Sequence, residues 1–279
     1  MPTLKDFNPG AQIKALVYGM SKVGKTEGAA TFPRPNFMDF DSGIATLSNP
    51  GFIKRHGWRP DIIYEQFTEH SVDARGVVKD HNAFDDACKY FDKYMGKDLV
   101  DTFDTWVIDT GTTLAEAAMN KALVLLGGNK GFSGAASNTL KMAQTHGLIV
   151  PKLQDYGSER SLVEQFVQMV KGTNKHVLLL CHEKETYDRD GNPTGIVPLL
   201  TGKGVEAICA MFDEIYNVRT RPKGLEREVY LQTVPDGIRK CGSRLGVPNG
   251  TAWTYDAVME SIKANNLERE SLTHANSQP

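Results

Sequence analysis

The sequence is short of cysteine, of long apolar runs and of net charge, and each shortage argues against a class of protein. The four cysteines form no Cys-x-x-Cys pair, which argues against a zinc site and fits thiols kept reduced in a cytoplasm. No apolar run approaches the roughly 20 residues of a membrane helix, and the N-terminal stretch lacks a signal-peptide pattern. We therefore expect a soluble, cytoplasmic protein with no membrane partner. A formal net charge of −2 excludes a bulk polycation, so nucleic acid would need a local basic strip.

Short apolar runs alternate with amphipathic stretches along the 279 residues. We predict strands at 13–19, 36–41, 61–67, 105–109 and 175–181, and helices at 25–31, 82–95, 112–126 and 158–171. Turn residues at 188–194 predict a hairpin, residues 212–220 and 228–233 predict late strands, and 255–265 predict a last helix before a frayed tail. This alternation predicts an α/β fold, a mostly parallel twisted sheet with helices on both faces and an antiparallel extension.

The segment GMSKVGKT, residues 19–26, matches the pattern G-x-x-x-x-G-K-[ST] of a phosphate-binding P-loop, or Walker A motif. In such a loop the glycines let backbone N–H groups surround phosphate oxygens, and the following helix points its positive end at the same anion. Lys25 would reach the β and γ phosphates, and the Thr26 hydroxyl would bind Mg²⁺. We therefore predict a site for ATP and Mg²⁺ whose nucleotide-binding residues are Gly19, Ser21, Lys22, Val23, Gly24, Lys25, Thr26 and Glu27.

A second ligand for Mg²⁺ is expected from an acidic residue at the end of a buried strand. The stretch TWVIDT supplies Asp109 directly after three apolar residues. The carboxyl ends of parallel strands face the crevice in which ligands bind, so the sequence predicts Asp109 as the second metal ligand. The alternative is that Asp109 only caps the helix that follows it.

Two further strands end in polar residues that could act on the γ phosphate. The stretch NFMDFD supplies Asp39 and Asp41, two positions apart at the end of one strand. Asp41 lies nearer the carboxyl end and is the candidate for orienting the attacking water, although the pair could instead begin a turn. The run KHVLLLC is followed directly by His182, which could sense the γ phosphate by hydrogen bonding or could simply open the surface hairpin.

The ordered set GMSKVGKT, FMDFD, TWVIDT and LLLCHEKE resembles the core of RecA-like ATPases. It looks most like the compact branch of AAA-type nucleotide-binding proteins encoded by bacteriophages, which includes single-strand annealing ATPases of the Sak type. The resemblance runs from about residue 13 to about residue 248. It implies a RecA-like P-loop fold with Asp109 as the Walker B acid and, for a phage protein, a location in the host cytoplasm.

The resemblance also implies roles for the two polar strand ends. Asp41 stands where RecA-like proteins place a catalytic Glu. The side chain of Asp is shorter than that of Glu, which affects its reach to the attacking water and hence the rate of hydrolysis. His182 stands where RecA has a Gln that senses the γ phosphate and leads into a DNA-binding loop. Residues 183–200 would then be the DNA loop, with Lys184 and Arg189 for phosphates. Acidic neighbours dilute that positive charge, so a plain solvated hairpin is the alternative.

RecA-like proteins bind ATP between subunits, where a Lys or Arg of the neighbour stabilises charge on the γ phosphate. The resemblance therefore implies a homo-oligomer assembled through the nucleotide site. The basic stretch IRKCGSRLGVP makes Arg244 the first candidate for this trans role, with Lys240 second and Lys203 third. Any one of them could instead be a solvated surface cation.

These observations predict a Mg²⁺-dependent ATPase that acts in DNA recombination or single-strand annealing and binds single-stranded DNA. We assign residues 1–250 to the ATPase core, with 127–154 as a mobile loop insertion, and 251–279 to a C-terminal helix and tail. The insertion could be a second DNA contact through Lys130, Phe132, Lys141 and Lys152. The alternative function is a nucleotide switch that regulates a replication or packaging protein without binding DNA. A small-molecule kinase ranks last because the sequence has no cluster of arginines suited to a lid.

Overall fold

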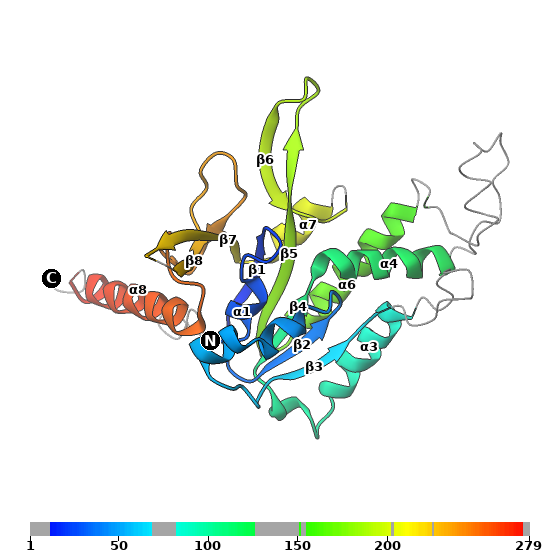
Figure 1. Ribbon diagram of the computed structural model, residues 1–279, viewed down its shortest axis with the longest axis horizontal. Helices are drawn as coiled ribbons and strands as arrows, with labels where there is room; N and C mark the ends of the chain where they lie inside the picture. Colours follow the sequence, from blue (N-terminus) through cyan, green and yellow to red (C-terminus); the bar gives the residue numbers. More distant parts are fainter. Residues whose placement is uncertain are drawn as a thin grey trace.

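Figure 1 shows the protein as a computed structural model that describes residues 12–68, 82–125, 151, 155–201, 204–224 and 226–275. The strands are β1 (Lys14–Gly19), β2 (Pro35–Asp39), β3 (Ile63–Gln66), β4 (Thr105–Asp109), β5 (His176–Tyr187), β6 (Pro193–Pro198), β7 (Glu214–Lys223), β8 (Glu226–Gln232) and β9 (Gly242–Ser243). Across the sheet they follow the order β3-β2-β4-β5-β1-β7-β8, with β6 paired to β5 and β9 to β7. Neighbours from β3 to β7 are parallel, whereas β6, β8 and β9 are antiparallel to their partners.

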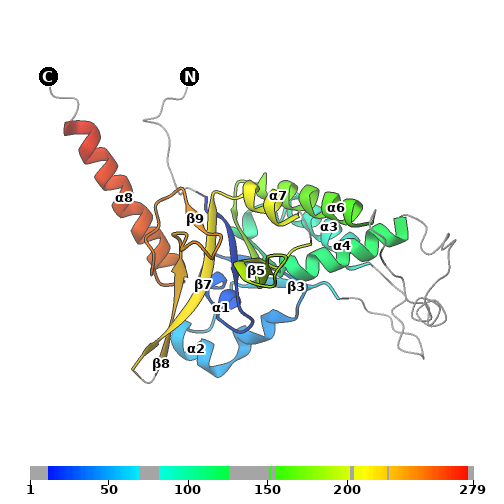
Figure 2. The ribbon, with the colours of Figure 1, turned by 90° about the horizontal axis from the view of Figure 1, so that it is seen from above.

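Helices cover both faces of this sheet. They are α1 (Lys25–Ala29), α2 (Pro50–His56), α3 (Ala83–Tyr94), α4 (Gly111–Leu125), α6 (Asp155–Lys171), α7 (Gly204–Met211) and α8 (Tyr255–Ala275), with short 3-10 turns η2 (Gly43–Ser48) and η3 (Val100–Thr102). Because side chains alternate along a strand, Leu16 and Tyr18 pack with α3, α4, α6 and α7, whereas Ala15 and Val17 pack with α1, α2 and α8. Figure 2 shows the first group of helices together on one side. The predicted α/β class, with its antiparallel extension, is confirmed.

Several boundaries differ from the predicted ones. Strand β2 ends at Asp39 rather than at residue 41, because the Asp39 carboxylate accepts hydrogen bonds from following backbone N–H groups and turns the chain. Strand β5 continues through His182 to Tyr187, because β6 pairs with its second half. The tail predicted to fray after residue 270 is helical to Ala275. Helix α2 was not predicted, although the Asn49 side chain caps it by accepting from the backbone N–H of Gly51.

Other sequence predictions fall where the structure gives no description. The proposed loop insertion at 127–154 lies outside the described residues, apart from residue 151. The division at residue 250 remains a prediction. Within the described ranges, no helix combines the length and the apolar composition needed to cross a bilayer.

The segment after residue 250 packs against the P-loop side of the sheet. Trp253 is 2% exposed and belongs to the same buried cluster as Phe32 and Val17. Its indole Nε1–H donates to the backbone carbonyl of Lys25 at 3.0 Å. The first turns of α8 follow, with Val258 and Ile262 buried in that cluster. A residue far along the chain therefore supports the first helix after the P-loop.

A buried histidine lies at the opposite end of the sheet. The Nδ1 atom of His176 accepts a hydrogen bond from the backbone N–H of Ile13 at 3.0 Å, so this nitrogen carries no proton. The pKa of His176 is lowered to about 4, mainly by burial and also by the nearby Lys14 ammonium, while Asp104 opposes the shift. This histidine therefore stays neutral in the folded protein at ordinary pH.

Candidate functional site

Six of the eight predicted nucleotide-binding residues meet in one cavity, which lies at the carboxyl ends of β1 and β4 and beside the middle of β5. The cavity measures about 400 Å³. Its lining includes the P-loop, the start of α1, the ends of β2 and β4, and His182 in the middle of β5. The residues are Ser21, Lys22, Gly24, Lys25, Thr26, Glu27, Asp41, Gly43, Thr46, Asp109, Thr110, His182 and Arg227. A volume of this size is typical of small-molecule sites.

The P-loop has the backbone shape that its glycines permit. Gly24 has φ of 109°, in the region that side chains with a Cβ rarely adopt, and it directly precedes α1. The Lys25 ammonium donates to the loop carbonyls of Gly19 at 3.0 Å and Met20 at 2.8 Å. Burial lowers the pKa of Lys25, and the carboxylate of Asp109 opposes that shift. The loop therefore holds a cation at the cavity wall, where an anion can compete for it.

Thr26 and Asp109 form the closest polar contact of the cavity. The Thr26 hydroxyl donates to Asp109 Oδ2 at 2.6 Å, although 83 positions separate the two residues. Asp109 is 2% exposed, and burial raises its pKa to about 6 while the hydrogen bond from Thr26 opposes the shift. The peptide bond between Asp109 and Thr110 is cis.

This pair suits Mg²⁺ by its chemistry. The ion prefers hard oxygen ligands, and proteins bind it through one or two carboxylates while phosphates and waters complete its coordination. A hydroxyl and a carboxylate oxygen that already touch supply two such ligands on one side of the phosphate cavity. In the part of the chain that the structure describes, no cluster of three or more His, Cys, Asp or Glu side chains offers a complete metal cage. The donor set therefore fits an ion carried in with a nucleotide.

The two aspartates after β2 have different environments. Asp39 is fully buried, and its Oδ1 accepts from the backbone N–H of Gly43 at 2.9 Å. Its Oδ2 accepts from the Gln66 amide at 3.2 Å, so this carboxylate is occupied in holding the turn. Asp41 lies outside the strand, at the rim of the cavity, with 46% of its side chain exposed. Of the two residues, Asp41 is the one placed to meet a ligand.

Asp41 and His182, which the sequence suggested separately, are in contact. His182 Nε2 lies 3.2 Å from Asp41 Oδ2. The backbone N–H of His182 donates to the Thr112 hydroxyl, and parallel pairing aligns His182 with Gly19 of the P-loop. The structure thus places a His–Asp pair beside the loop, on the same cavity that Lys25 lines.

Two predicted nucleotide-binding residues lie beside the cavity rather than in its lining. Gly19 contributes its carbonyl to Lys25, and the Val23 side chain is buried in the core cluster with α1. Glu27 lines the cavity, but its carboxylate accepts from Arg55 at 2.8 Å and lies 3.0 Å from His56 Nε2. Any role of Gly19 and Val23 toward a nucleotide would therefore involve the backbone.

Arg244 lies far from the cavity of its own chain. It follows β9, whose Ser243 pairs with Glu214 at the start of β7, and Glu214 in turn pairs with Ala15 at the start of β1. The loop residues that line the cavity come after Gly19, which lies roughly 13 Å further along β1 at the usual rise of a strand. Arg244 is ion-paired with Asp213 at 2.5 Å. Arg244 therefore does not take part in the P-loop cavity of its own chain.

The other two candidates for a trans role differ from Arg244. Lys240 is exposed and makes no ion pair with any residue that the structure describes, and its backbone N–H donates to the carbonyl of Ile196 on the β5–β6 hairpin. Lys203 is outside the described ranges. Lys240 therefore remains a free surface cation, which Arg244 is not.

The hairpin proposed as a DNA loop projects from the body of the molecule (Figure 1). Its Lys184 ammonium donates to the carbonyl of Leu200 at 2.7 Å and is therefore engaged within the chain. Arg189 is exposed, next to the acidic Asp188 and Asp190. The proposed second DNA contact at Lys130, Phe132, Lys141 and Lys152 lies outside the described residues.

Sequence reasoning missed several residues of the cavity. Gly43 and Thr46 belong to η2, and Thr110 follows the predicted metal ligand. Arg227 comes from β8, more than 200 positions after the P-loop. The neighbours of Thr110 could have suggested it, but no local pattern distinguishes Arg227 from other exposed arginines. Its presence in the cavity depends on how β8 lies over the loop.

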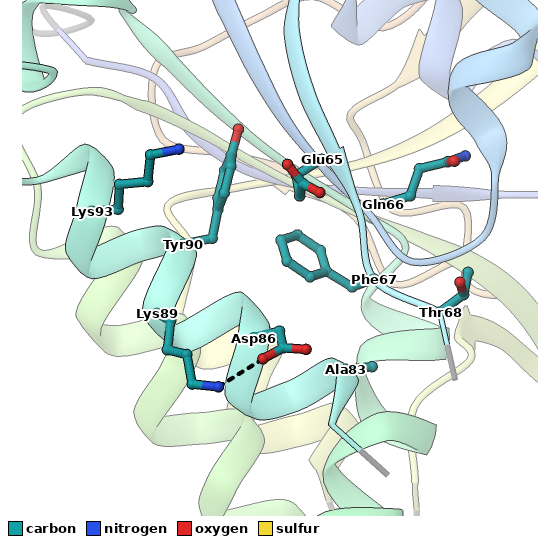
Figure 3. A pocket seen from close by; sticks show the side chains of 9 residues that line it. All are labelled: Glu65, Gln66, Phe67, Thr68, Ala83, Asp86, Lys89, Tyr90 and Lys93. Carbon is teal, nitrogen blue, oxygen red and sulfur yellow. Dashed lines mark hydrogen bonds and ion pairs between the residues drawn. The ribbon is translucent and has the colours of Figure 1, made fainter. Parts of the chain in front are cut away.

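A second cavity lies at the far edge of the sheet. It measures about 300 Å³ and lies between β3 and α3, with Phe67, Tyr90 and Lys93 in its lining (Figure 3). Its Lys89 and Asp86 are ion-paired with each other at 2.8 Å. Strands β2, β4 and β5 separate β3 from the P-loop strand, so this cavity is distinct from the P-loop cavity.

The fold and the cavity define a class of protein. A mostly parallel sheet, a P-loop after β1 and an acid at the end of β4, with β5 lying between those two strands, make the chain a RecA-like P-loop α/β protein. The profile of an AAA domain family matches residues 11–240, and the chain belongs to this family.

Comparison with solved structures gives a more distant likeness. The chain is similar to a KaiC-like protein, PH0186, from the hyperthermophilic archaeon Pyrococcus horikoshii OT3, with 12% identity over 79% of this chain and 77% of that chain and a TM-score of 0.39. At that level of similarity no residue role is carried over. No curated protein matches the chain.

Proposed function

We propose that this chain binds ATP with Mg²⁺ at the P-loop cavity and hydrolyses it. The observation that carries the proposal is the 2.6 Å contact between Thr26 Oγ1 and Asp109 Oδ2 in a cavity that Lys25 also lines. A phosphate-binding lysine and two oxygen ligands for a metal are the parts that phosphoryl transfer to water requires. Membership of the AAA domain family supports the same activity.

Each residue of the cavity has a part in the proposed reaction. Lys25 and the backbone N–H groups of the loop hold the β and γ phosphates. Thr26 and Asp109 would hold Mg²⁺, which neutralises charge on those phosphates when it is bound. Asp41 positions the water that attacks the γ phosphate in line. His182, in contact with Asp41, responds to whether that phosphate is present.

The test is ATP turnover by a variant that lacks the loop cation. Lys25→Ala is expected to reduce turnover to the background level with the fold intact by circular dichroism, because among the described lysines Lys25 alone donates to the loop carbonyls of Gly19 and Met20. Lys54→Ala removes an exposed lysine on α2 and serves as the matched control, with turnover unchanged. Retained turnover in Lys25→Ala would refute the assignment.

We propose further that the ATPase acts in DNA recombination or single-strand annealing, as a homo-oligomer on single-stranded DNA. The resemblance of the ordered motifs to Sak-type annealing ATPases supports this process, as does the path of β5. That strand carries His182 at the cavity and continues directly into the projecting hairpin, so a change at the γ phosphate has a short route to it. ATP turnover measured with and without single-stranded DNA tests the idea, and stimulation is expected.

The acidic side chains of the hairpin favour a second candidate, a nucleotide switch that acts on a protein partner. Glu183, Glu185, Asp188 and Asp190 outnumber the basic residues there, and Lys184 is already engaged. Binding to oligo(dT) at several salt concentrations separates the two candidates. If phosphates are contacted, the logarithm of affinity falls steeply with the logarithm of salt concentration. If the protein does not bind oligo(dT) and its ATP turnover is the same with and without single-stranded DNA, the nucleotide switch is favoured.

A further inference from the structure

Arg227 stands at the border of two adjoining cavities. One is the P-loop cavity, and the other measures about 340 Å³ and has Arg55, His56 and Trp253 in its lining. The two cavities share Gly24, Glu27 and Arg227. A ligand that extends from the phosphate loop into the second cavity must therefore pass this arginine.

The strand that carries Arg227 is held in place over the P-loop. Val229 packs on the loop so closely that a Cβ on Gly24 would lie 3.3 Å from its methyl groups. The backbone carbonyl of Val229 accepts from the Trp253 N–H at 3.1 Å, and β8 pairs with β7 along its length. Since Arg227 is two residues before Val229, both side chains project from the same side of the strand. That side faces the nucleotide loop.

The charge of Arg227 is not used within the described structure. The side chain is exposed, and among described residues it makes no ion pair or hydrogen bond. The nearest acidic residue in sequence whose side chain is described, Glu228, accepts instead from Arg221 at 2.6 Å. Glu27, which shares both cavities with Arg227, is engaged by Arg55 and His56. Among the described residues, Arg227 is thus a cation without an ion-pair partner on the wall of the P-loop cavity.

We propose that Arg227 binds the polyphosphate of the nucleotide in cis, from the same chain that supplies the P-loop. This inference rests on the proposed function and adds a residue to it. A guanidinium presents a planar fork of N–H donors that matches phosphate oxygens, and such charge-assisted bonds are among the stronger polar contacts in proteins. The chain then supplies within one subunit a cationic contact of the kind expected only from a neighbour.

The first test compares ligand affinities of two arginine variants. Arg227→Ala is expected to weaken both ATP and inorganic tripolyphosphate about 10-fold or more, the effect of losing a hydrogen bond to a charged group. Arg221→Ala is the matched control, since Arg221 lies on the neighbouring strand and pairs with Glu228. It should bind both ligands as the unchanged protein does.

The possible results of this test are distinct. If Arg227→Ala binds ATP and tripolyphosphate normally while Lys25→Ala loses them, the inference about Arg227 is wrong and the proposed function stands. If only ATP binding weakens, Arg227 contacts the nucleoside and the polyphosphate assignment is overturned. If the unchanged protein binds neither ligand, the proposed function fails and the inference fails with it.

A mixing experiment tests whether the contact is made in cis. Lys25→Ala and Arg227→Ala proteins are combined, and ATP turnover is measured. A trans contact would let an Arg227 on the Lys25→Ala chain complete the site of the other chain and restore turnover. The cis arrangement predicts no restoration at any ratio. Recovery of turnover in the mixture would overturn the assignment in cis.

Discussion

Replacing Trp253 by alanine tests whether the segment after residue 250 supports the P-loop. The indole is 2% exposed, lies 5.7 Å from the ring of Phe32 between centroids, and donates to the carbonyl of Lys25 at 3.0 Å. It also closes over Gly28 in α1, where a Cβ would lie 2.0 Å from the ring. Trp253→Ala therefore removes both a packing surface and a hydrogen bond beneath the nucleotide loop.

The expected loss is large compared with the stability of a typical domain. Truncation of a buried tryptophan to alanine costs about 3–5 kcal/mol, since it combines lost burial with a residual cavity. Native proteins are stable by only about 5–15 kcal/mol. With a urea dependence of about 3 kcal/mol per molar, the unfolding midpoint should fall by about 1 M or more.

The assay is urea unfolding followed by far-ultraviolet circular dichroism. Trp58→Ala is the control, because that indole is 67% exposed and its loss should change stability by less than about 0.5 kcal/mol. Trp253→Phe retains most of the packing but lacks the N–H donor to Lys25, and about 1 kcal/mol of destabilisation is expected. Equal midpoints for Trp253→Ala and Trp58→Ala would refute the idea that this segment supports α1.

Three further predictions follow from single contacts. Gly28→Ala should destabilise the protein by about 1–3 kcal/mol in urea unfolding, because its Cβ would overlap an indole ring, whereas Gly157→Ala, with no atom within 4 Å of its Cβ, should not. Asp41→Asn should slow ATP turnover at unchanged nucleotide affinity. The double variant of Asp41→Asn and His182→Asn should lose no more ATP turnover than the more damaging single variant, since the two side chains are in contact. Additive losses of turnover would show that the two residues act separately. His176 has a folded pKa of about 4 against 6.5 in the unfolded chain, so its contribution of up to about 3 kcal/mol is present above pH 6.5 and lost as the pH falls to 4. His176→Asn should flatten the pH dependence of the urea midpoint in that window, and an unchanged slope would contradict the assignment.

Much of the fold could be predicted from local patterns. The run TWVID is entirely buried in β4, and the spacing of GMSKVGKT agrees with a loop between β1 and α1. Such features depend on residues a few positions apart, which is the range over which hydrophobic periodicity and glycine placement act. Boundaries were less well predicted where a long-range partner decides them, as where β6 extends β5 past His182.

Only part of the candidate site could be predicted, again because local patterns do not report long-range contacts. Thr26 and Asp109 could be suggested as partners because each belongs to a motif with a stated chemistry. The contact between Asp41 and His182 could not be predicted, since each residue carried only its own local pattern. No local pattern marks Arg227 as a cavity residue, and none indicates that Arg244 forms an ion pair with Asp213.

The amino-acid sequence by itself determined that this chain forms alternating strands and helices, that a loop with the P-loop pattern follows the first strand, and that an acid ends a later buried strand. The tertiary structure alone decided which of these elements lie side by side. It brought Arg227 and Trp253 to the P-loop and placed Arg244 toward the other end of the sheet. The physical reason is that periodicity reports which side of an element is buried, whereas strand order and register determine what that side meets.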